Sequence, residues 1–108
     1  MGMMRIAFLM QDTGVVYGAE RATLDLVAGL KQAGTMVLVL LIEETRLNLR
    51  TSALRNELDQ RGVQWIAIKT KRPFSWSLVR NIRRVLHDGK ADILHTIGYK
   101  ADWHGGLA

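Results

Sequence analysis

Four short runs of almost uninterrupted apolar residues, separated by segments with helical periodicity, constrain this sequence most. The runs are Met4 to Met10, Val37 to Ile42, Val63 to Ile68 and Ala91 to His95. An apolar run of this length without polar alternation is typical of a strand that is buried on both faces, as in a parallel sheet. The sequence therefore predicts an α/β fold in which helices cover both faces of a parallel sheet.

The segment after the first strand predicts a helix over Ala19 to Ala33. Leu26, Leu30 and Ala33 stand at i, i+4 and i+7, so we expect them on its buried face. Gly34 follows at the position where a left-handed residue closes many helices. This helix would return the chain to the start of the second strand.

Two further helices are expected. Leu54 and Leu58 mark a short helix that ends at Gly62, with an exposed ion pair between Glu57 and Arg61 at i, i+4. The next helix has Ser75 as its predicted N-cap and ends at Gly89; its apolar stripe consists of Leu78, Val79, Ile82, Val85 and Leu86. The polar segment Glu43 to Arg50 predicts a loop over the strand ends, and a final helix is expected from about Tyr99.

The expected sheet order is 3-2-1-4, because right-handed crossovers place the first three strands in one direction before the chain returns to the other side of strand one. We predict a Rossmann-like three-layer domain over residues 1–108, without an internal boundary. The sequence ends where a further helix would still be packing onto the sheet, so we expect a fragment truncated at its C-terminus.

Composition excludes some classes of protein. The chain of 108 residues has no cysteine, which excludes disulfides and thiolate chemistry. No apolar run approaches the roughly 20 residues that a membrane span needs, and no signal peptide precedes the first strand, so we expect a cytoplasmic protein. The formal charge of +5 favours anionic partners without identifying one.

The loop between the first strand and the first helix is the first candidate binding segment. In a sheet of order 3-2-1-4, a crevice opens where the loops after strands one and four diverge. Gly14 and Gly18 permit a positive φ and a close approach of the backbone to a ligand. No Ser, Thr, Asp or Asn caps the helix at Ala19, so its free N–H groups could bind an anion. Glu20 suits the first helical turn with or without a ligand, and a turn that only redirects the chain remains open.

The loop after the fourth strand supplies the other wall of this crevice, with Gly98, Tyr99 and Lys100. His95 is expected at the carboxyl end of that strand, where it could act as a general base or bind a hydroxyl group. Lys100 could pair with a phosphate. Hydrogen bonding of His95 to nearby backbone, and solvation of Lys100, are the structural alternatives.

Two stretches, "YGAERATLDLVAGL" (Tyr17 to Leu30) and "ADILHTIGYKADWHGGLA" (Ala91 to Ala108), resemble the amino-terminal domain of family 4 glycosyltransferases of the GT-B fold. The resemblance implies retaining transfer of a sugar from a nucleotide diphosphate sugar, without a metal or other cofactor, to a glycan or lipid-linked acceptor in the cell envelope. This chain would be the acceptor-side half, and the carboxyl-terminal donor-binding domain would be absent. We therefore expect the fragment alone to be inactive.

The resemblance also implies roles for individual residues. Gly14, Gly18 and Glu20 match the loop that approaches the donor diphosphate or acceptor. Tyr17 replaces the first glycine of the family's glycine-glycine-any-glutamate motif. The family often has histidine-any-histidine at the end of strand four, which here reads His95 and Ile97. Ile97 forms no hydrogen bond through its side chain, so only His95 is a candidate catalytic residue, with a weak role.

A basic face on the predicted third helix favours an anionic partner. Arg80, Arg83, Arg84 and His87 stand at i, i+3, i+4 and i+7, preceded by a basic segment from Lys69 to Arg72. The interpretations are an ordinary solvated face and contact with an anionic membrane at the inner face of the cell. The three tryptophans are not interleaved with the basic residues, which argues against nucleic acid. A stand-alone nucleotide- or phosphate-binding α/β module is the alternative to a transferase.

Overall fold

The computed structural model describes residues 4–47, 51–71 and 76–97. In chain order the elements are β1 (Arg5–Gln11), α1 (Gly18–Gln32), β2 (Met36–Glu44), the 3-10 helix η1 (Thr45–Leu47), α2 (Ala53–Gln60), β3 (Gln64–Thr70), α3 (Trp76–Asp88) and β4 (Ile93–Ile97). Strands and helices alternate, which confirms the predicted α/β pattern. In these three ranges, no helix is long and apolar enough to cross a membrane.

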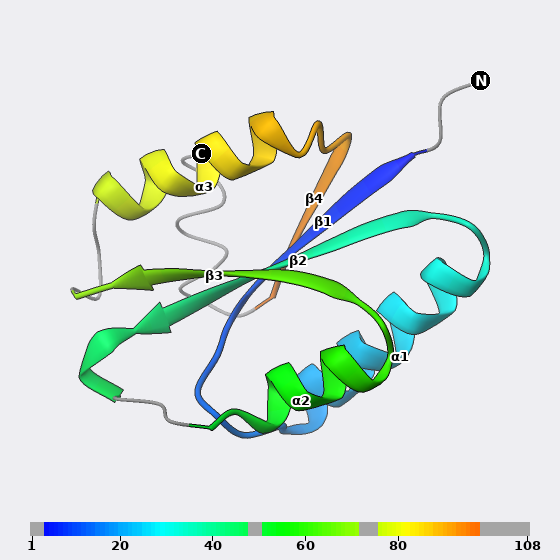
Figure 1. The fold of residues 1–108 in the computed structure, drawn as a ribbon, viewed down its shortest axis with the longest axis horizontal. Coiled ribbons are helices and arrows are strands. Elements are labelled where there is room, and N and C mark those ends of the chain that lie inside the picture. Colours follow the sequence, from blue (N-terminus) through cyan, green and yellow to red (C-terminus); the bar gives the residue numbers. More distant parts are fainter. Residues whose placement is uncertain (1–3, 48–50, 72–75, 98–108) are drawn as a thin grey trace.

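The four strands form one parallel sheet in the order β3-β2-β1-β4, as the sequence predicts. Figure 1 shows α1 and α2 on one face of this sheet and α3 on the other. The two crossovers through α1 and α2 lay out β1, β2 and β3 in one direction, and the crossover through α3 returns the chain to the far side of β1. The ends of β1 and β4 therefore lie side by side, which is where the predicted crevice begins.

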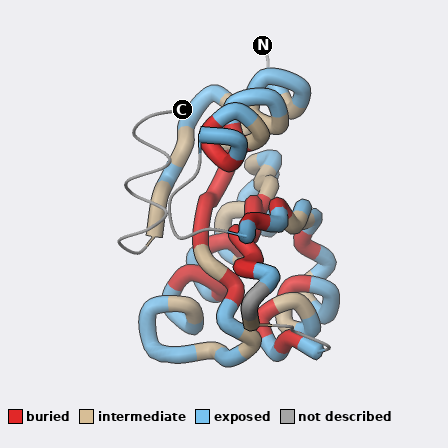
Figure 2. Tube along the Cα trace, turned by 90° about the vertical axis from the view of Figure 1, so that its left-hand side faces the viewer, coloured by how far each residue is buried: buried red, intermediate tan, exposed pale blue. Residues whose placement is uncertain are grey.

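Each face of the sheet has its own hydrophobic core, and Figure 2 shows the buried residues concentrated between the helical layers. The core under α1 and α2 consists of Phe8, Met10, Leu24, Val27, Val39, Leu41, Leu54, Leu58 and Val63. The core under α3 consists of Leu9, Leu40, Ile42, Ile68, Leu78 and Ile82. Consecutive residues of β1 and β2 thus face opposite cores, as strand geometry requires. Helices on both faces explain why these strands are apolar throughout.

The buried face of α1 differs from the prediction. Thr23, Leu24 and Val27 are buried, whereas Leu26 is 48% exposed and Ala33 is exposed. Leu30 is half-buried against the core, so only this member of the predicted set was correct. The helix has several apolar positions and more than one possible face, and packing against β1 and β2 selects the face that contains Leu24.

The ends of α1, α2 and α3 show the same hydrogen-bond pattern around a residue of positive φ, which at α2 is Gly62. At the end of α1, Gly34 has φ +92° and the Thr35 N–H donates to the Leu30 carbonyl at 3.0 Å, which confirms the left-handed cap. At the end of α3 the left-handed residue is Lys90 (φ 53°) rather than a glycine. At Gly89 a Cβ would lie 3.1 Å from the Val85 carbonyl oxygen, a tight contact that a small shift of the backbone would have to relieve.

The strand boundaries also correct two predictions. Glu43 and Glu44 belong to β2 and are buried, so the loop expected from residue 43 begins later. The fourth strand runs over Ile93–Ile97 instead of 91–95. Leu54 and Leu58 are buried on α2, and Glu57 pairs with Arg61, both as predicted. The predicted cap Ser75 and the helix expected from residue 99 lie outside the described residues.

Candidate functional site

The glycine loop, residues 12–17, connects β1 to α1 at the carboxyl edge of the sheet, and it passes beside the start of α2 (Figure 1). Gly14 has φ +89°, so the turn needs a glycine there. Its N–H donates to Asp12 Oδ1 at 2.9 Å, and its carbonyl accepts the Ala53 N–H at 3.0 Å. The predicted conformational role of Gly14 is therefore confirmed, and α2 holds the turn in place.

The N-terminus of α1 has no side-chain cap. Tyr17 occupies the N-cap position in extended conformation without a capping hydrogen bond, and 66% of its surface is exposed. Gly18 is the first helical residue and does not have a positive φ, which corrects one of its two expected roles. A Cβ on Gly18 would meet none of the described residues within 4 Å, so these residues leave space beside the free N–H groups. Glu20 lies in the first turn, half-buried.

His95 lies in the middle of β4, two residues before its end, and not at the carboxyl end as predicted. It pairs in register with Phe8 of β1, and the two rings lie 5.2 Å apart at an interplanar angle of 48°. The side chain is exposed. Ile97, at the end of β4, packs against the core under α1 and α2. The predicted site residues Gly98, Tyr99 and Lys100 lie outside the described residues.

Sequence analysis missed a group of buried charged and polar side chains beneath the glycine loop. Asp12 is fully buried, and its carboxylate accepts hydrogen bonds from Ser52 Oγ (2.8 Å) and Arg55 Nε (2.7 Å) in addition to Gly14. Arg55 Nη2 lies 3.0 Å from Glu43 Oε2, a close ion pair without hydrogen-bond alignment. We call Asp12, Glu43, Ser52 and Arg55 the acidic clamp, because two buried carboxylates hold one arginine and one serine of the α2 segment.

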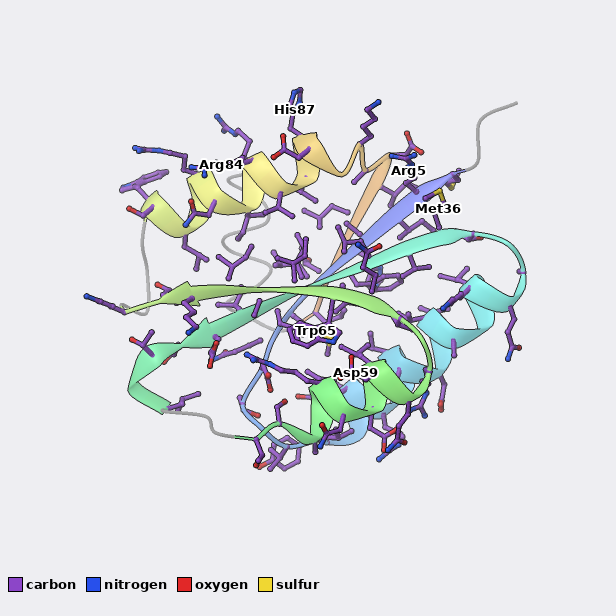
Figure 3. All side chains as sticks on the ribbon, in the orientation of Figure 1. Arg5, Met36, Asp59, Trp65, Arg84 and His87 are labelled. Atoms are coloured by element: carbon purple, nitrogen blue, oxygen red, sulfur yellow. The ribbon has the colours of Figure 1, made fainter. Side chains whose placement is uncertain are left out.

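The electrostatics of the clamp favour the charged form of Arg55. Burial lowers the pKa of Arg55, but the carboxylates of Glu43 and Asp12 outweigh burial and raise that pKa above its ordinary value. The guanidinium also lies over the ring of Trp65, 5.1 Å from the centroid. Trp65 in turn donates from Nε1 to Asp59 Oδ1 at 2.8 Å, and Figure 3 shows these two side chains facing each other. Arg55 therefore connects the glycine loop with β2 and β3.

Part of the clamp has a sequence signal. Ser52 stands directly before an amphipathic segment, which is typical of an N-cap, and its hydroxyl does accept the Arg55 N–H. Asp12 stands two residues before Gly14, a pattern typical of an Asx turn. Nothing in the sequence indicates that these two local motifs meet, because they are 40 residues apart.

The predicted basic face of α3 exists in the structure. Its members Arg80, Arg83, Arg84 and His87 are all exposed, and Figure 3 shows Arg84 and His87 pointing away from the sheet. Trp76, at the start of α3, is 64% exposed beside them. This face is on the opposite side of the sheet from α1 and α2, so it is separate from the crevice wall formed by the glycine loop.

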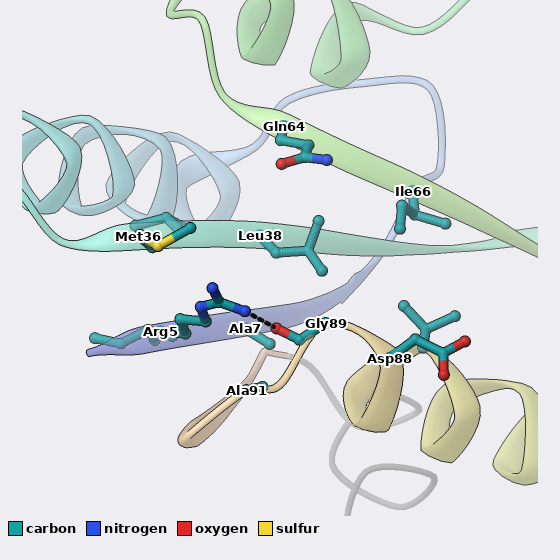
Figure 4. A pocket seen from close by; sticks show the side chains of 12 residues that line it. Arg5, Ala7, Met36, Leu38, Gln64, Ile66, Asp88, Gly89 and Ala91 are labelled. Atoms are coloured by element: carbon teal, nitrogen blue, oxygen red, sulfur yellow. Dashed lines mark hydrogen bonds between the residues drawn. The ribbon is translucent and has the colours of Figure 1, made fainter. Parts of the chain in front are cut away.

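A hollow of about 390 Å³ lies at the other end of the sheet, between the strand N-termini and the end of α3 (Figure 4). Leu38, Ile66 and Val85 form part of its lining, and Arg5 closes one side by donating from Nη1 to the Gly89 carbonyl at 3.2 Å. None of the predicted site residues that the structure describes lines it. Among the residues that the structure describes, no group of His, Asp and Glu could hold a metal ion.

Comparison with known proteins identifies the family. A family model described as Glycosyltransferase Family 4 matches residues 16–108. The chain belongs to glycosyltransferase family 4. The match to the family 4 glycosyltransferase model begins in the glycine loop. It continues through every element from α1 to β4. The resemblance found in the sequence is thus confirmed.

The fold of this family 4 domain is similar to that of solved GT-B glycosyltransferases. HepE of Anabaena, in crystals with UDP and glucose, matches with a TM-score of 0.72 and 22% identity over 96% of this chain and 26% of HepE. MurG of Acinetobacter baumannii matches with a TM-score of 0.66 and 16% identity over 97% of this chain and 31% of MurG. The chain therefore spans between a quarter and a third of these proteins. No curated protein matches it.

Proposed function

We propose that this chain is the acceptor-side domain of a retaining glycosyltransferase that moves a sugar from a nucleotide diphosphate sugar to a glycan or lipid-linked acceptor of the cell envelope. Membership of glycosyltransferase family 4 carries this proposal. HepE, which has a similar fold, was crystallised with UDP and glucose, and this supports a nucleotide sugar as donor. The proposed chemistry needs no metal ion or other cofactor.

The glycine loop is the proposed contact with the donor diphosphate or the acceptor. The uncapped N-terminus of α1 presents free N–H groups that favour an anion. The open space at Gly18 leaves room for a ligand. Glu20 would accept hydrogen bonds from ligand hydroxyls, and His95 retains a weak catalytic role. Gly98, Tyr99 and Lys100 would complete the other side of the crevice.

A pair of glycine substitutions tests the loop in the full-length gene product. Gly18 and Gly29 both lie in α1, and a Cβ would meet nothing within 4 Å at either position. G18L fills the space at the helix N-terminus, and we expect about a tenfold or greater fall in kcat/KM with the preferred nucleotide sugar. G29L serves as the control and should transfer at the rate of the parent. Equal rates for G18L and G29L would contradict the role of the loop.

We do not expect the 108-residue chain alone to transfer sugar, because a second domain would bind the nucleotide. The assay would compare this chain with the full-length product against a panel of uridine, guanosine and adenosine diphosphate sugars. Release of nucleoside diphosphate that depends on acceptor, seen only with the longer product, supports the proposal. Turnover by the short chain would contradict the two-domain arrangement, and absence of turnover by both would favour a nucleotide-binding module.

The basic face of α3 is the proposed contact with an anionic membrane at the inner face of the cell. Arg80 and Arg84 are exposed on one side of α3, and each basic residue near an anionic surface adds about 1 kcal/mol to binding. R80Q/R84Q should therefore weaken binding to vesicles that contain phosphatidylserine about 30-fold. R21Q/K31Q removes two charges from α1 on the opposite face and should bind as the parent does. Equal binding to neutral vesicles would contradict this contact.

A further inference from the structure

We propose that Asp12 is the positioning residue of the glycine loop, and that it transmits the position of α2 to the ligand-binding turn through Ser52 and Arg55. This inference rests on the proposed function in so far as the loop binds substrate. Asp12 would not contact the ligand, but it would determine the position of the loop that does.

Both hydrogen-bonding groups of Gly14 are held by groups that α2 positions. The N–H of Gly14 donates to Asp12 Oδ1 at 2.9 Å, and the carbonyl accepts from the Ala53 N–H, the first residue of α2, at 3.0 Å. Gly14 has φ +89° in the folded chain. In the unfolded chain a glycine is free to adopt many other conformations. Fixing its N–H and its carbonyl at once selects one orientation of the turn.

The carboxylate of Asp12 is fully engaged. Oδ1 accepts from Gly14 and from Ser52 Oγ, and Oδ2 accepts from Arg55 Nε at 2.7 Å and also lies 2.9 Å from Ser52 Oγ. The backbone N–H of Asp12 donates to the Ile42 carbonyl at 2.9 Å, so the residue is also anchored to β2. A buried carboxylate with donors on both oxygens, one of them charged, has one stable orientation.

The donors themselves are fixed by the fold of α2. Ser52 is the N-cap of this helix and accepts the Arg55 N–H at 3.2 Å, while Arg55 is held further by Glu43 and Trp65. Leu54 and Leu58 dock α2 against the core. A shift of α2 would therefore move the partners of Asp12 and with them the turn at Gly14. The beginning of α1 follows four residues later, at Gly18.

The first test measures the loop without any ligand. In D12N, one carboxylate oxygen becomes an NH₂ group that cannot accept a hydrogen bond, so we expect amide hydrogen exchange at Gly14 and Ala53 to become about tenfold faster or more. V39A, a core truncation in β2, is the destabilised comparison, and D88N makes the same Asp to Asn change at an exposed position of α3, on the other side of the sheet from the clamp. Exchange at Gly14 in D12N no faster than in V39A would overturn the inference.

The second test uses sugar transfer by the full-length product. D12N should raise KM for the ligand at the loop about tenfold, with a smaller change in kcat, whereas V39A and D88N should leave KM unchanged. R55K, which keeps a positive charge at position 55 but lacks the Nε donor of Arg55, should raise KM less than D12N does. Faster exchange with an unchanged KM would support the positioning role of Asp12 and contradict the binding role of the loop, so the two proposals fail separately.

Discussion

Gly14 is the residue at which the chain turns from β1 toward α1. At φ +89° an L-residue with a Cβ is strained, because its side chain approaches the neighbouring carbonyl. This backbone strain limits what can replace Gly14.

We expect Gly14→Ala to lower the free energy of unfolding by about 1 to 2 kcal/mol, measured by urea denaturation. Gly29→Ala is the matched control, since Gly29 lies inside α1 with open space at its Cβ. That change should raise stability by up to about 1 kcal/mol. Equal effects of the two substitutions would show that the turn tolerates a side chain.

Glu57 gives the fold a pH dependence at the level of one side chain. The hydrogen bond from Arg61, together with the charges of Arg61 and Arg21, holds the pKa of Glu57 below its ordinary value of 4.5, although desolvation acts in the other direction. A carboxyl whose pKa is lower in the folded state contributes stability above its unfolded pKa, and this contribution disappears as the pH falls through the folded value.

Glu57→Gln should therefore reduce the stability at pH 7 and have a smaller effect at about pH 2, because the contribution of Glu57 disappears as the pH falls through its lowered folded pKa. Urea denaturation of both variants at the two pH values measures the difference. Asp88→Asn is a suitable comparison, because the described part of the chain offers Asp88 no ion pair. A Glu57→Gln effect that is the same at both pH values would mean that the ion pair does not stabilise the fold.

Among the elements, α1 shows how packing decides which helical face is buried. Leu24 is 1% exposed, whereas Leu26 is 48% exposed on the same helix. The sequence placed Leu26 inside because Leu26, Leu30 and Ala33 have helical spacing, but Thr23, Leu24, Val27 and Leu30 have it as well. Which of the two faces is buried depends on how α1 is rotated about its axis against the sheet. The sequence of the helix alone does not determine this rotation.

The two leucines should consequently respond differently to truncation. Leu24→Ala should lower the free energy of unfolding by about 2 to 5 kcal/mol because it leaves a cavity in the core. Leu26→Ala should change it by less than about 0.5 kcal/mol. Thermal or urea unfolding measures both, and a larger loss for Leu26 would reverse the assignment of the buried face.

The elements of the site were predictable to different degrees. Gly14 and the uncapped start of α1 followed from the sequence, because a strand, a glycine turn and an amphipathic segment are all local patterns. The acidic clamp did not, because Asp12 and Arg55 meet only after two crossovers bring α2 beside the loop. The sequence predicts a loop at Glu43 and Glu44 because burial of a carboxylate costs free energy. The partners that offset this cost lie far away in the sequence, so the sequence does not show them.

For the whole molecule, strand order and parallel direction were predictable because handedness rules leave few arrangements for alternating strands and helices. The sheet is not equally protected at its two edges. β3 has α2 near one face and α3 near the other, whereas β4 has no fully buried residue and Ile93 is 45% exposed.

We expect hydrogen exchange to follow this difference. Amides of β1 and β2, in the centre of the sheet, should exchange most slowly, and those of β4 should exchange faster than those of β3 although both are edge strands of the described sheet. Exchange followed by NMR or mass spectrometry measures the order. Protection of β4 equal to that of β1 would indicate that other residues cover it.

The acidic clamp also has a consequence for how the chain acquires its shape. Its hydrogen bonds join positions 40 and 43 residues apart, so they close large loops and form late compared with the turns inside each helix. The segment β1-α1-β2 by itself would have a glycine loop without its partners in α2. The glycine loop would therefore become able to bind its ligand only late in folding, when α2 has docked. A ligand bound there would stabilise the folded domain relative to every partly folded form.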